Sequence, residues 1–203
     1  MLRLHHAPNT RSGRIVWLLE ELGLPYELNR LDFHPSALKA PEHRARHPLG
    51  RVPVLDDGEV RLFESGAIVE YVLARHGGGR LRPPVDDPRF PAYLQWLHYA
   101  EGMVMPPVNT IMVETMFLPP ERQNPESRAR AEKLLKKAVA PLEAVLADQP
   151  FLVGEALSGA DIMLGHAVVV AARLGAVDDE QPHLQAYVDR VAARPAFQTA
   201  MAA

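Results

Sequence analysis

The stretch from His47 to Val69 reads HPLGRVPVLDDGEVRLFESGAIV, and it decides the expected fold. Its segment Val52–Leu55 is short, apolar and rich in valine, which predicts a buried strand. The pair Asp57-Gly58 follows, and such a pair between two apolar runs is typical of a hairpin because glycine tolerates the positive φ of the turn. We therefore predict a strand at 52–55, an antiparallel strand at 60–63, and then a helix that Ser65 caps.

Two features of this stretch suit a small zwitterionic peptide. Pro53 lies inside the first predicted strand, and an X-Pro bond is where a cis peptide is accessible. A cis bond would turn the backbone polar groups of Val52 outward. The helix after Ser65 offers free N–H groups, a hydroxyl and the positive end of its dipole to a carboxylate, while Glu64 suits an ammonium group.

The residues before this stretch predict a parallel strand–helix–strand unit. Leu2–His6 is the first strand, and a turn follows at residues 7–10. A helix begins at about Ser12 and ends at Gly23, with apolar residues spaced three and four apart. Tyr26–Leu31 is the second strand, and residues 35–46 are a polar helix or an irregular segment.

The chain resembles the soluble glutathione transferases. RVPVL at 51–55 followed by ESGAI at 64–68 resembles their glutathione-binding half, and RIVWLLEELGLPYE at 14–27 resembles the bacterial members. The resemblance implies a thioredoxin-like α/β domain of order βαβ-α-ββα and a C-terminal all-α domain. We expect the first domain at 1–79, a proline-rich linker at 80–87 and the helical domain at 88–203.

In the helical domain we predict no strand. A helix over 90–104 should be kinked or broken by Pro106-Pro107 and should resume over 109–117. A long helix over 126–147, with Leu134 among its inward residues, should bend at Pro141. Ser158 and Asp161 resemble a capping box before a buried helix that ends at 174. The last predicted helix spans 183–193, and a short tail follows.

Composition narrows the function. The 203 residues carry a net charge of −3 and no long apolar run, so nothing indicates nucleic acid or a membrane, and the cytoplasm is the default location. There is no cysteine, which excludes the branch of the family that uses its own thiol. Any thiol must come from the ligand. His43 and His47 lie four apart without a third ligand, so we predict no metal site.

The resemblance places the catalytic hydrogen-bond donor in the turn after the first strand. That donor lowers the pKa of the glutathione thiol, since only the thiolate is a good nucleophile. Many members have a tyrosine in the first strand, whereas this chain has His5 and His6 there. The candidates are Thr10 first, then Asn9 and Ser12, with Arg11 as a cationic alternative. Ser12 could instead cap the helix, and Asn9 could be a plain turn residue.

The resemblance also implies the glutathione contacts. The backbone of Val52, next to Pro53, would bind the cysteinyl part, and Ser65 would bind the γ-glutamyl carboxylate. Glu64 would face the amino group, and Arg51 would bind the glycyl carboxylate. The second substrate would lie against the helical domain, where methionines adapt to varied apolar shapes. The alternative is that half or more of the candidate residues are core packing. Those candidates are His98, Tyr99, Met103, Met105, Met112 and Met116.

The resulting hypothesis is a glutathione transferase that joins the glutathione thiolate to electrophilic, largely apolar small molecules. The resemblance implies a homodimer and a role in detoxification. One alternative is glutathione-dependent peroxidase, dehalogenase or isomerase activity at the same site. Another is a non-catalytic glutathione-binding or regulatory protein of the same fold.

Overall fold

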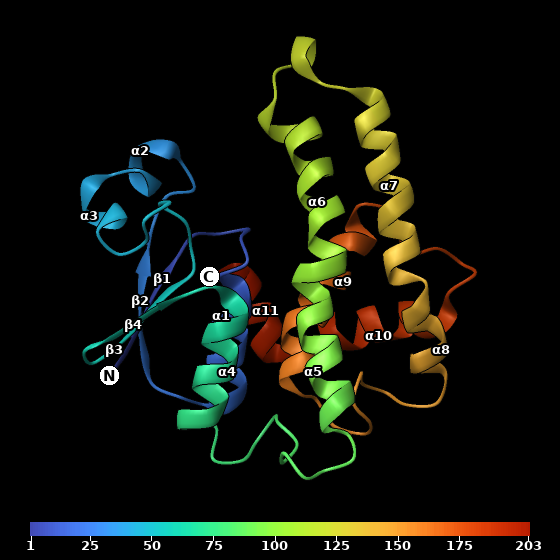
Figure 1. The fold of residues 1–203 in the computed structure, drawn as a ribbon, viewed down its shortest axis with the longest axis horizontal. Helices are drawn as coiled ribbons and strands as arrows, with labels where there is room; N and C mark the ends of the chain where they lie inside the picture. The colour runs from blue at the N-terminus through green and yellow to red at the C-terminus, as the bar shows by residue number, and fades with distance from the viewer. The chain divides into compact units, whose positions relative to one another are not determined.

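The computed structural model describes residues 1–203, which divide into two compact units. Unit 1 comprises Met1–Arg82 and Ala193–Ala203, and unit 2 comprises Pro83–Ala192. Unit 1 is built on a β-sheet and unit 2 is made of helices (Figure 1). This confirms a thioredoxin-like domain followed by a helical domain. None of the helices combines the length and apolar character needed to cross a membrane.

The sheet of unit 1 contains four strands in the order β2-β1-β3-β4. β1 (Leu2–His6) pairs in parallel with β2 (Tyr26–Arg30) and antiparallel with β3 (Val54–Asp57). β3 pairs antiparallel with β4 (Val60–Phe63), and the hairpin turn has Gly58 at φ 61°. The hairpin prediction is confirmed, but β3 begins at Val54, so Pro53 lies before the strand and not inside it.

Successive residues of β1 point to opposite faces of the sheet. Leu2, Leu4 and His6 are buried on one face. Unit 1 has its core there, formed with α1 (Gly13–Leu22) and α4 (Ser65–His76). The apolar positions predicted for the first helix are all buried: Ile15, Leu18, Leu19 and Leu22.

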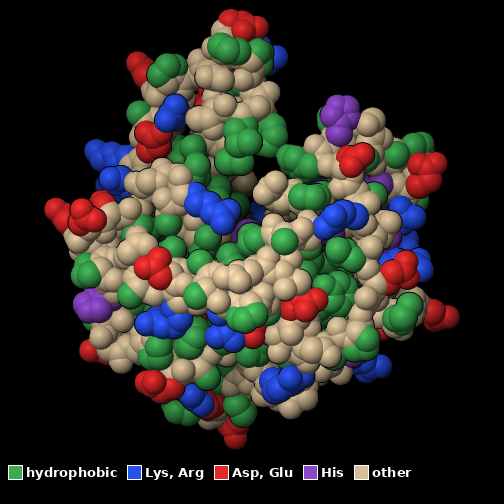
Figure 2. Space-filling model, turned by 180° about the vertical axis from the view of Figure 1, so that it is seen from behind, with side chains coloured by type: hydrophobic (Ala, Val, Ile, Leu, Met, Phe, Trp, Pro, Cys, Tyr) green, Lys and Arg blue, Asp and Glu red, His purple; other side chains and the backbone are tan.

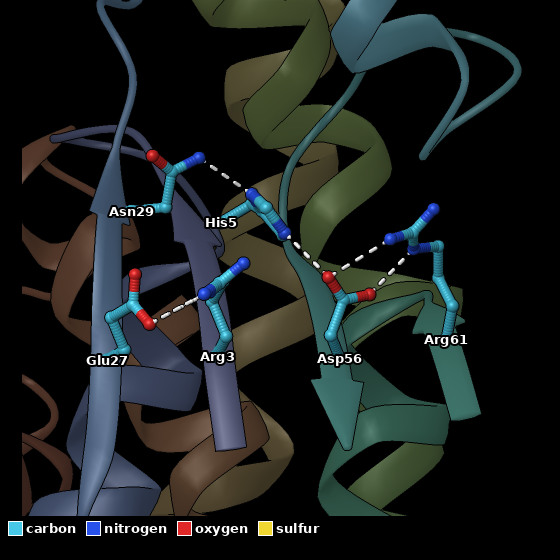
Figure 3. Close-up of polar contacts among 6 residues, drawn as sticks. All are labelled: Arg3, His5, Glu27, Asn29, Asp56 and Arg61. Atoms are coloured by element: carbon cyan, nitrogen blue, oxygen red, sulfur yellow. Dashed lines mark hydrogen bonds and ion pairs between the residues drawn. The ribbon is translucent and has the colours of Figure 1, made fainter. Parts of the chain in front are cut away.

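The other face of the sheet carries a chain of polar contacts (Figure 3). The ring of His5 contacts Asn29 at 2.7 Å and Asp56 at 3.0 Å, and Asp56 binds Arg61 at 2.6 Å. The Arg61 guanidinium, together with His5, holds the pKa of Asp56 at about 2, although partial burial opposes this. Burial lowers the pKa of His5 despite the carboxylate beside it. These contacts join all four strands through side chains.

The end of the chain returns to unit 1. α11 (Pro195–Ala202) packs on α1, where the rings of Trp17 and Phe197 meet edge to face at 4.9 Å. Arg194 makes a bidentate ion pair with Glu21, at 2.5 and 2.8 Å. We expected a short tail here and assigned these residues to the helical domain. The structure shows a helix within unit 1, because an apolar ring and a cation find partners on α1.

Unit 2 begins with α5 (Phe90–Tyr99), a π-helical turn at Ala100–Val104, and α6 (Met105–Met112). A second π-helical turn, Val113–Phe117, follows. The prediction that Pro106-Pro107 kinks or breaks the helix is only partly right. The prolines lie in the first turn of α6, where the missing N–H groups cost little, and the preceding turn changes its hydrogen-bond pattern.

The predicted long helix over 126–147 is two helices, α7 (Pro125–Val139) and α8 (Pro141–Ala147). Pro141 starts a new helix, where its fixed φ is favourable. Leu134 is 52% exposed, so its predicted inward position was wrong, whereas the neighbouring Leu135 is buried.

α9 (Gly159–Arg173) is the most buried helix of unit 2, and α10 (Pro182–Ala192) packs on it. The predicted capping box is confirmed. The Asp161 carboxylate accepts hydrogen bonds from Ser158 N and Oγ, both at 2.8 Å, and from Leu152 N at 3.0 Å. The Tyr187 hydroxyl donates to the same carboxylate at 3.0 Å. Burial raises the pKa of Asp161 although these donors oppose it.

Candidate active site

The segment before β3 is held in place by the side chain of Lys39, which follows the short helix α2 (Pro35–Leu38), and by the side chain of His43 in the short helix α3 (Pro41–Arg44). Lys39 Nζ donates to the carbonyl oxygens of Leu49 at 2.6 Å and Gly50 at 3.3 Å. His43 Nε2 donates to the carbonyl of Arg51 at 2.9 Å. Because that acceptor is a carbonyl, the proton of His43 lies on Nε2.

Gly50 lets this segment lie directly against α2. Its φ is 55°, and a Cβ there would overlap the carbonyl oxygen of Leu38. After it, the Val52–Pro53 peptide bond is cis. Arg51 is exposed, Val52 is half-buried and Pro53 is buried. Val52 is therefore partly accessible, and the three residues before it are held by the side chains of Lys39 and His43.

α4 begins with an unusual backbone conformation. Glu64 has φ 76° and ψ 114°, which non-glycine residues adopt only under constraint, and it occupies the N-cap position without a capping side-chain bond. Ser65 is the first helical residue, so the prediction that Ser65 is the cap was wrong. No side chain caps the N-terminus of α4, and its backbone N–H groups can receive an anion.

The hydroxyl of Ser65 has a partner that sequence reasoning missed. Arg14 is fully buried in α1, and its Nη1 donates to Ser65 Oγ at 3.2 Å. This contact joins α1, which follows the turn after β1, to the start of α4, and it brings a positive charge to the same place. The sequence held a signal, because Arg14 lies four residues before Leu18 and so shares the buried face of the helix.

The turn after β1 contains the four candidate thiolate donors. Asn9 is exposed with φ 58°, Thr10 and Arg11 are half-buried, and Ser12 is completely buried. Ser12 Oγ lies 2.6 Å from Thr10 Oγ1 and 2.8 Å from His6 Nδ1. Ser12 occupies the N-cap position of α1, as the alternative expected, but its side chain makes no capping hydrogen bond to the helix. Its hydroxyl faces the protein interior, whereas Thr10 and Asn9 reach the surface.

The candidates for the second substrate lie in unit 2, in different surroundings. His98 is exposed, and Met103 is 52% exposed. The Tyr99 hydroxyl donates to the carbonyl of Ala138 at 3.0 Å, and burial raises the pKa of Tyr99. Met112 is half-buried. Of the two further methionines, Met105 is buried in the core and Met116 is exposed.

Neither unit contains a group of three or more His, Asp or Glu side chains placed to hold a metal ion. Basic and acidic side chains are intermixed over the face seen in Figure 2. This face therefore has no large patch of one sign, in agreement with the small net charge of −3.

Two family models match the chain, the N-terminal domain of glutathione S-transferase at residues 1–74 and its C-terminal domain at residues 104–195. The chain belongs to the glutathione S-transferase family. Among its curated relatives, glutathione S-transferase 4 of Zea mays is 38% identical over 197 residues, which cover 91% of this chain and 84% of the relative.

Solved structures of the same family have the same fold. A glutathione S-transferase from Actinobacillus pleuropneumoniae is 29% identical with a TM-score of 0.80, over 98% of this chain and 91% of that one. The theta class enzyme from Xanthomonas axonopodis pv. citri, solved with glutathione bound, is 27% identical with a TM-score of 0.85. That match covers 100% of this chain and 97% of the other.

Proposed function

We propose that the chain binds glutathione on unit 1 and transfers its thiolate to an electrophilic carbon of an apolar small molecule. The observation that carries this proposal is the uncapped N-terminus of α4, with Ser65 at its first position and Glu64 before it. Such a helix end binds a carboxylate, and an acidic side chain beside it binds an ammonium group. The γ-glutamyl end of glutathione carries both charges on one carbon.

The rest of the tripeptide follows from this orientation. Its cysteinyl part would pair with the surface backbone of Val52, at the segment that Pro53 ends. Arg51 is exposed and would bind the glycyl carboxylate. The protein then supplies binding and orientation, which turn a bimolecular reaction into one between positioned groups.

Thr10 is the proposed donor to the sulfur. Its hydroxyl is half-buried in the turn that leads into α1, so it can reach both the interior and a ligand. Asn9 and Arg11 are the next candidates because they also reach the surface, and the buried hydroxyl of Ser12 ranks last. A free thiol has a pKa of about 8.5, and a hydrogen bond to the charged form lowers that value. The proton released from the thiol passes to water, and as the C–S bond forms at a substituted carbon the bond to its leaving group breaks, which releases chloride when the electrophile is a chloronitroarene.

One experiment tests binding and chemistry together. The purified chain is passed over immobilised glutathione and then assayed with glutathione and a chloronitroarene. Retention and formation of the conjugate are expected. The ultraviolet thiolate band of bound glutathione, followed against pH, should give a thiol pKa below that of free glutathione. Retention without conjugation and with an unshifted thiol pKa would indicate a binding protein and contradict the catalytic proposal.

Cellular location, oligomeric state and the second substrate can be inferred as well. We infer a cytoplasmic homodimer of the bacterial type that acts in detoxification, without a metal, on electrophiles held near His98, Tyr99, Met103 and Met112. The family match and the likeness to two bacterial structures support these inferences. Light scattering after gel filtration measures the mass, and a monomer at working concentration would contradict the dimer.

A further inference from the structure

A short chain of hydrogen-bonding groups lies behind the turn that holds Thr10. Thr10 Oγ1 is 2.7 Å from the carbonyl oxygen of Ala7 and 2.6 Å from Ser12 Oγ. Ser12 Oγ is 2.8 Å from Nδ1 of His6, and it also accepts a longer bond from the N–H of Ala7 at 3.2 Å. Ser12 and His6 are buried, so water does not replace the partners of these two side chains.

Counting protons decides the direction of these bonds. Three short contacts, Thr10–Ala7, Thr10–Ser12 and Ser12–His6, each need one proton between the two heavy atoms. The two hydroxyls supply only two protons, and the Ala7 carbonyl supplies none. The third must come from the imidazole. His6 Nδ1 therefore carries a proton and donates it to Ser12. Ser12 donates to Thr10 at 2.6 Å in preference to the Ala7 carbonyl at 3.2 Å, and the hydroxyl proton of Thr10 turns to that carbonyl at 2.7 Å.

The opposite tautomer would disable Thr10. If Nδ1 accepted a proton from Ser12, the 2.6 Å contact between the two hydroxyl oxygens would need the proton of Thr10. Thr10 would then have none to donate elsewhere. With Nδ1–H as donor, the proton of Thr10 needs only to rotate from the Ala7 carbonyl to an incoming sulfur, and no heavy atom moves.

We propose that His6 is a positioning residue, which donates from Nδ1 to Ser12 and so leaves the hydroxyl proton of Thr10 free for the glutathione sulfur. The inference rests on the proposed function, because it needs Thr10 as the thiolate donor. In this arrangement His6, on β1, acts on the glutathione sulfur through the hydroxyls of Ser12 and Thr10 and does not contact the ligand itself.

The surroundings of His6 fit a neutral ring with its proton on Nδ1. Burial is the main cause that lowers the pKa of His6, and the charge of Arg30 on β2 lowers it further, so the surroundings favour the neutral ring. The backbone of Ala203 opposes this lowering, yet His6 Nε2 has no hydrogen-bond partner of good geometry. A buried N–H without an acceptor is costly, so the single proton is better placed on Nδ1.

The test is the thiol pKa of bound glutathione, read from the thiolate band, in a set of variants. Thr10→Val should raise this pKa toward about 8.5. His6→Phe, which keeps the ring shape without Nδ1, should raise it by about one unit, a tenfold loss of thiolate at pH below the pKa. His6→Asn should restore most of the shift, because the asparagine amide can donate from nearly the same place. The affinity for glutathione, measured at a pH below the thiol pKa of the complex, should stay within about twofold in the two His6 variants, since His6 makes no proposed contact with the ligand.

His5→Phe is the matched control, because it removes the neighbouring buried histidine, whose contacts lie on the opposite face of the sheet. It should leave the thiol pKa unchanged. Ser12→Ala removes the hydroxyl that links His6 to Thr10, so it should raise the thiol pKa as His6→Phe does. It provides the same test if His6→Phe does not fold. A normal thiol pKa in folded His6→Phe or Ser12→Ala, with a raised one in Thr10→Val, would overturn this inference alone. An unshifted thiol pKa in the unmodified protein would overturn the proposed function.

Discussion

The N-termini of α4 and α9 each lie beside a serine, but they differ in whether a side chain of the protein caps them. At α9, the carboxylate of Asp161 folds back over the first turn and binds the backbone and hydroxyl of Ser158. At α4, no side chain caps the first turn, and the hydroxyl of Ser65 is turned to the guanidinium of Arg14. One helix end is closed by the chain's own carboxylate, and the other is open.

The difference shows where a ligand is expected. The first backbone N–H groups of a helix have no partner within the helix, so they bind a side chain, water or a ligand. α9 lies in the core of unit 2, where an unbound N–H would be costly, and Asp161 satisfies that need. α4 starts at the surface beside the exposed Glu64 and can leave its N–H groups for an external carboxylate.

The largest effect is expected from a substitution at the closed N-terminus of α9. Asp161→Ala removes the acceptor of four hydrogen bonds, and should lower the free energy of unfolding by about 3–5 kcal/mol, as measured by urea denaturation. Asp148→Ala, at an exposed position, is the control and should stay within about 0.5 kcal/mol of the unmodified chain. A loss of less than about 1 kcal/mol in Asp161→Ala would show that the closed end is not needed.

A substitution at the open N-terminus of α4 should change the affinity for glutathione more than the free energy of unfolding. Ser65→Ala removes the proposed hydroxyl contact to the γ-glutamyl carboxylate, and should weaken glutathione binding about 10- to 100-fold in calorimetry. The free energy of unfolding should fall by only about 1 kcal/mol, since Arg14 loses one neutral acceptor. Ser127→Ala, in the first turn of α7, is the matched control. Equal affinity in both variants would remove Ser65 from the site.

The open end can also be closed by design. Ala67 is exposed in the first turn of α4, three residues after the N-cap, where α9 carries Asp161. Ala67→Asp should stabilise the helix by about 0.3–1 kcal/mol and weaken glutathione binding about tenfold or more, because its carboxylate occupies the anion position. Ala74→Asp adds the same charge further along α4 and should leave binding nearly unchanged. Similar affinities for the two variants would contradict an anion site at this helix end.

The smallest effect is expected at the ion pair between Asp56 and Arg61 on the β-sheet of unit 1. The pKa of Asp56 is about 2, below its usual value, so its contact with Arg61 contributes stability that is present above about pH 4 and is lost as the pH falls toward 2. Asp56→Asn should therefore lower the free energy of unfolding by about 1–2 kcal/mol at pH 6, by about half as much at pH 3, and by almost nothing below about pH 2. A pH-independent difference would show that the ion pair does not cause it. Asp161 differs in direction, because burial raises its pKa.

The sequence predicted what depends on local patterns. The strands of unit 1 follow from short apolar runs and the Asp57-Gly58 turn, and the capping box at Ser158 follows from residues three apart. The hydrogen-bond partners of Ser12 and Ser65 could not be predicted from the sequence. Each could cap a helix, and each instead binds a residue that the fold brings near, His6 or Arg14. The return of α11 to unit 1 was missed because the partners of Arg194 and Phe197 lie on α1, far away in the sequence.

The central claim is that the open end of α4 receives the γ-glutamyl carboxylate of glutathione. A crystal structure of the chain with glutathione bound tests it most directly. We expect a carboxylate oxygen of the γ-glutamyl group at about 3 Å from Ser65 Oγ and from a backbone N of the first turn of α4, with the sulfur near Thr10. Glutathione bound with this carboxylate away from α4, and the helix end occupied by water alone, would contradict the account.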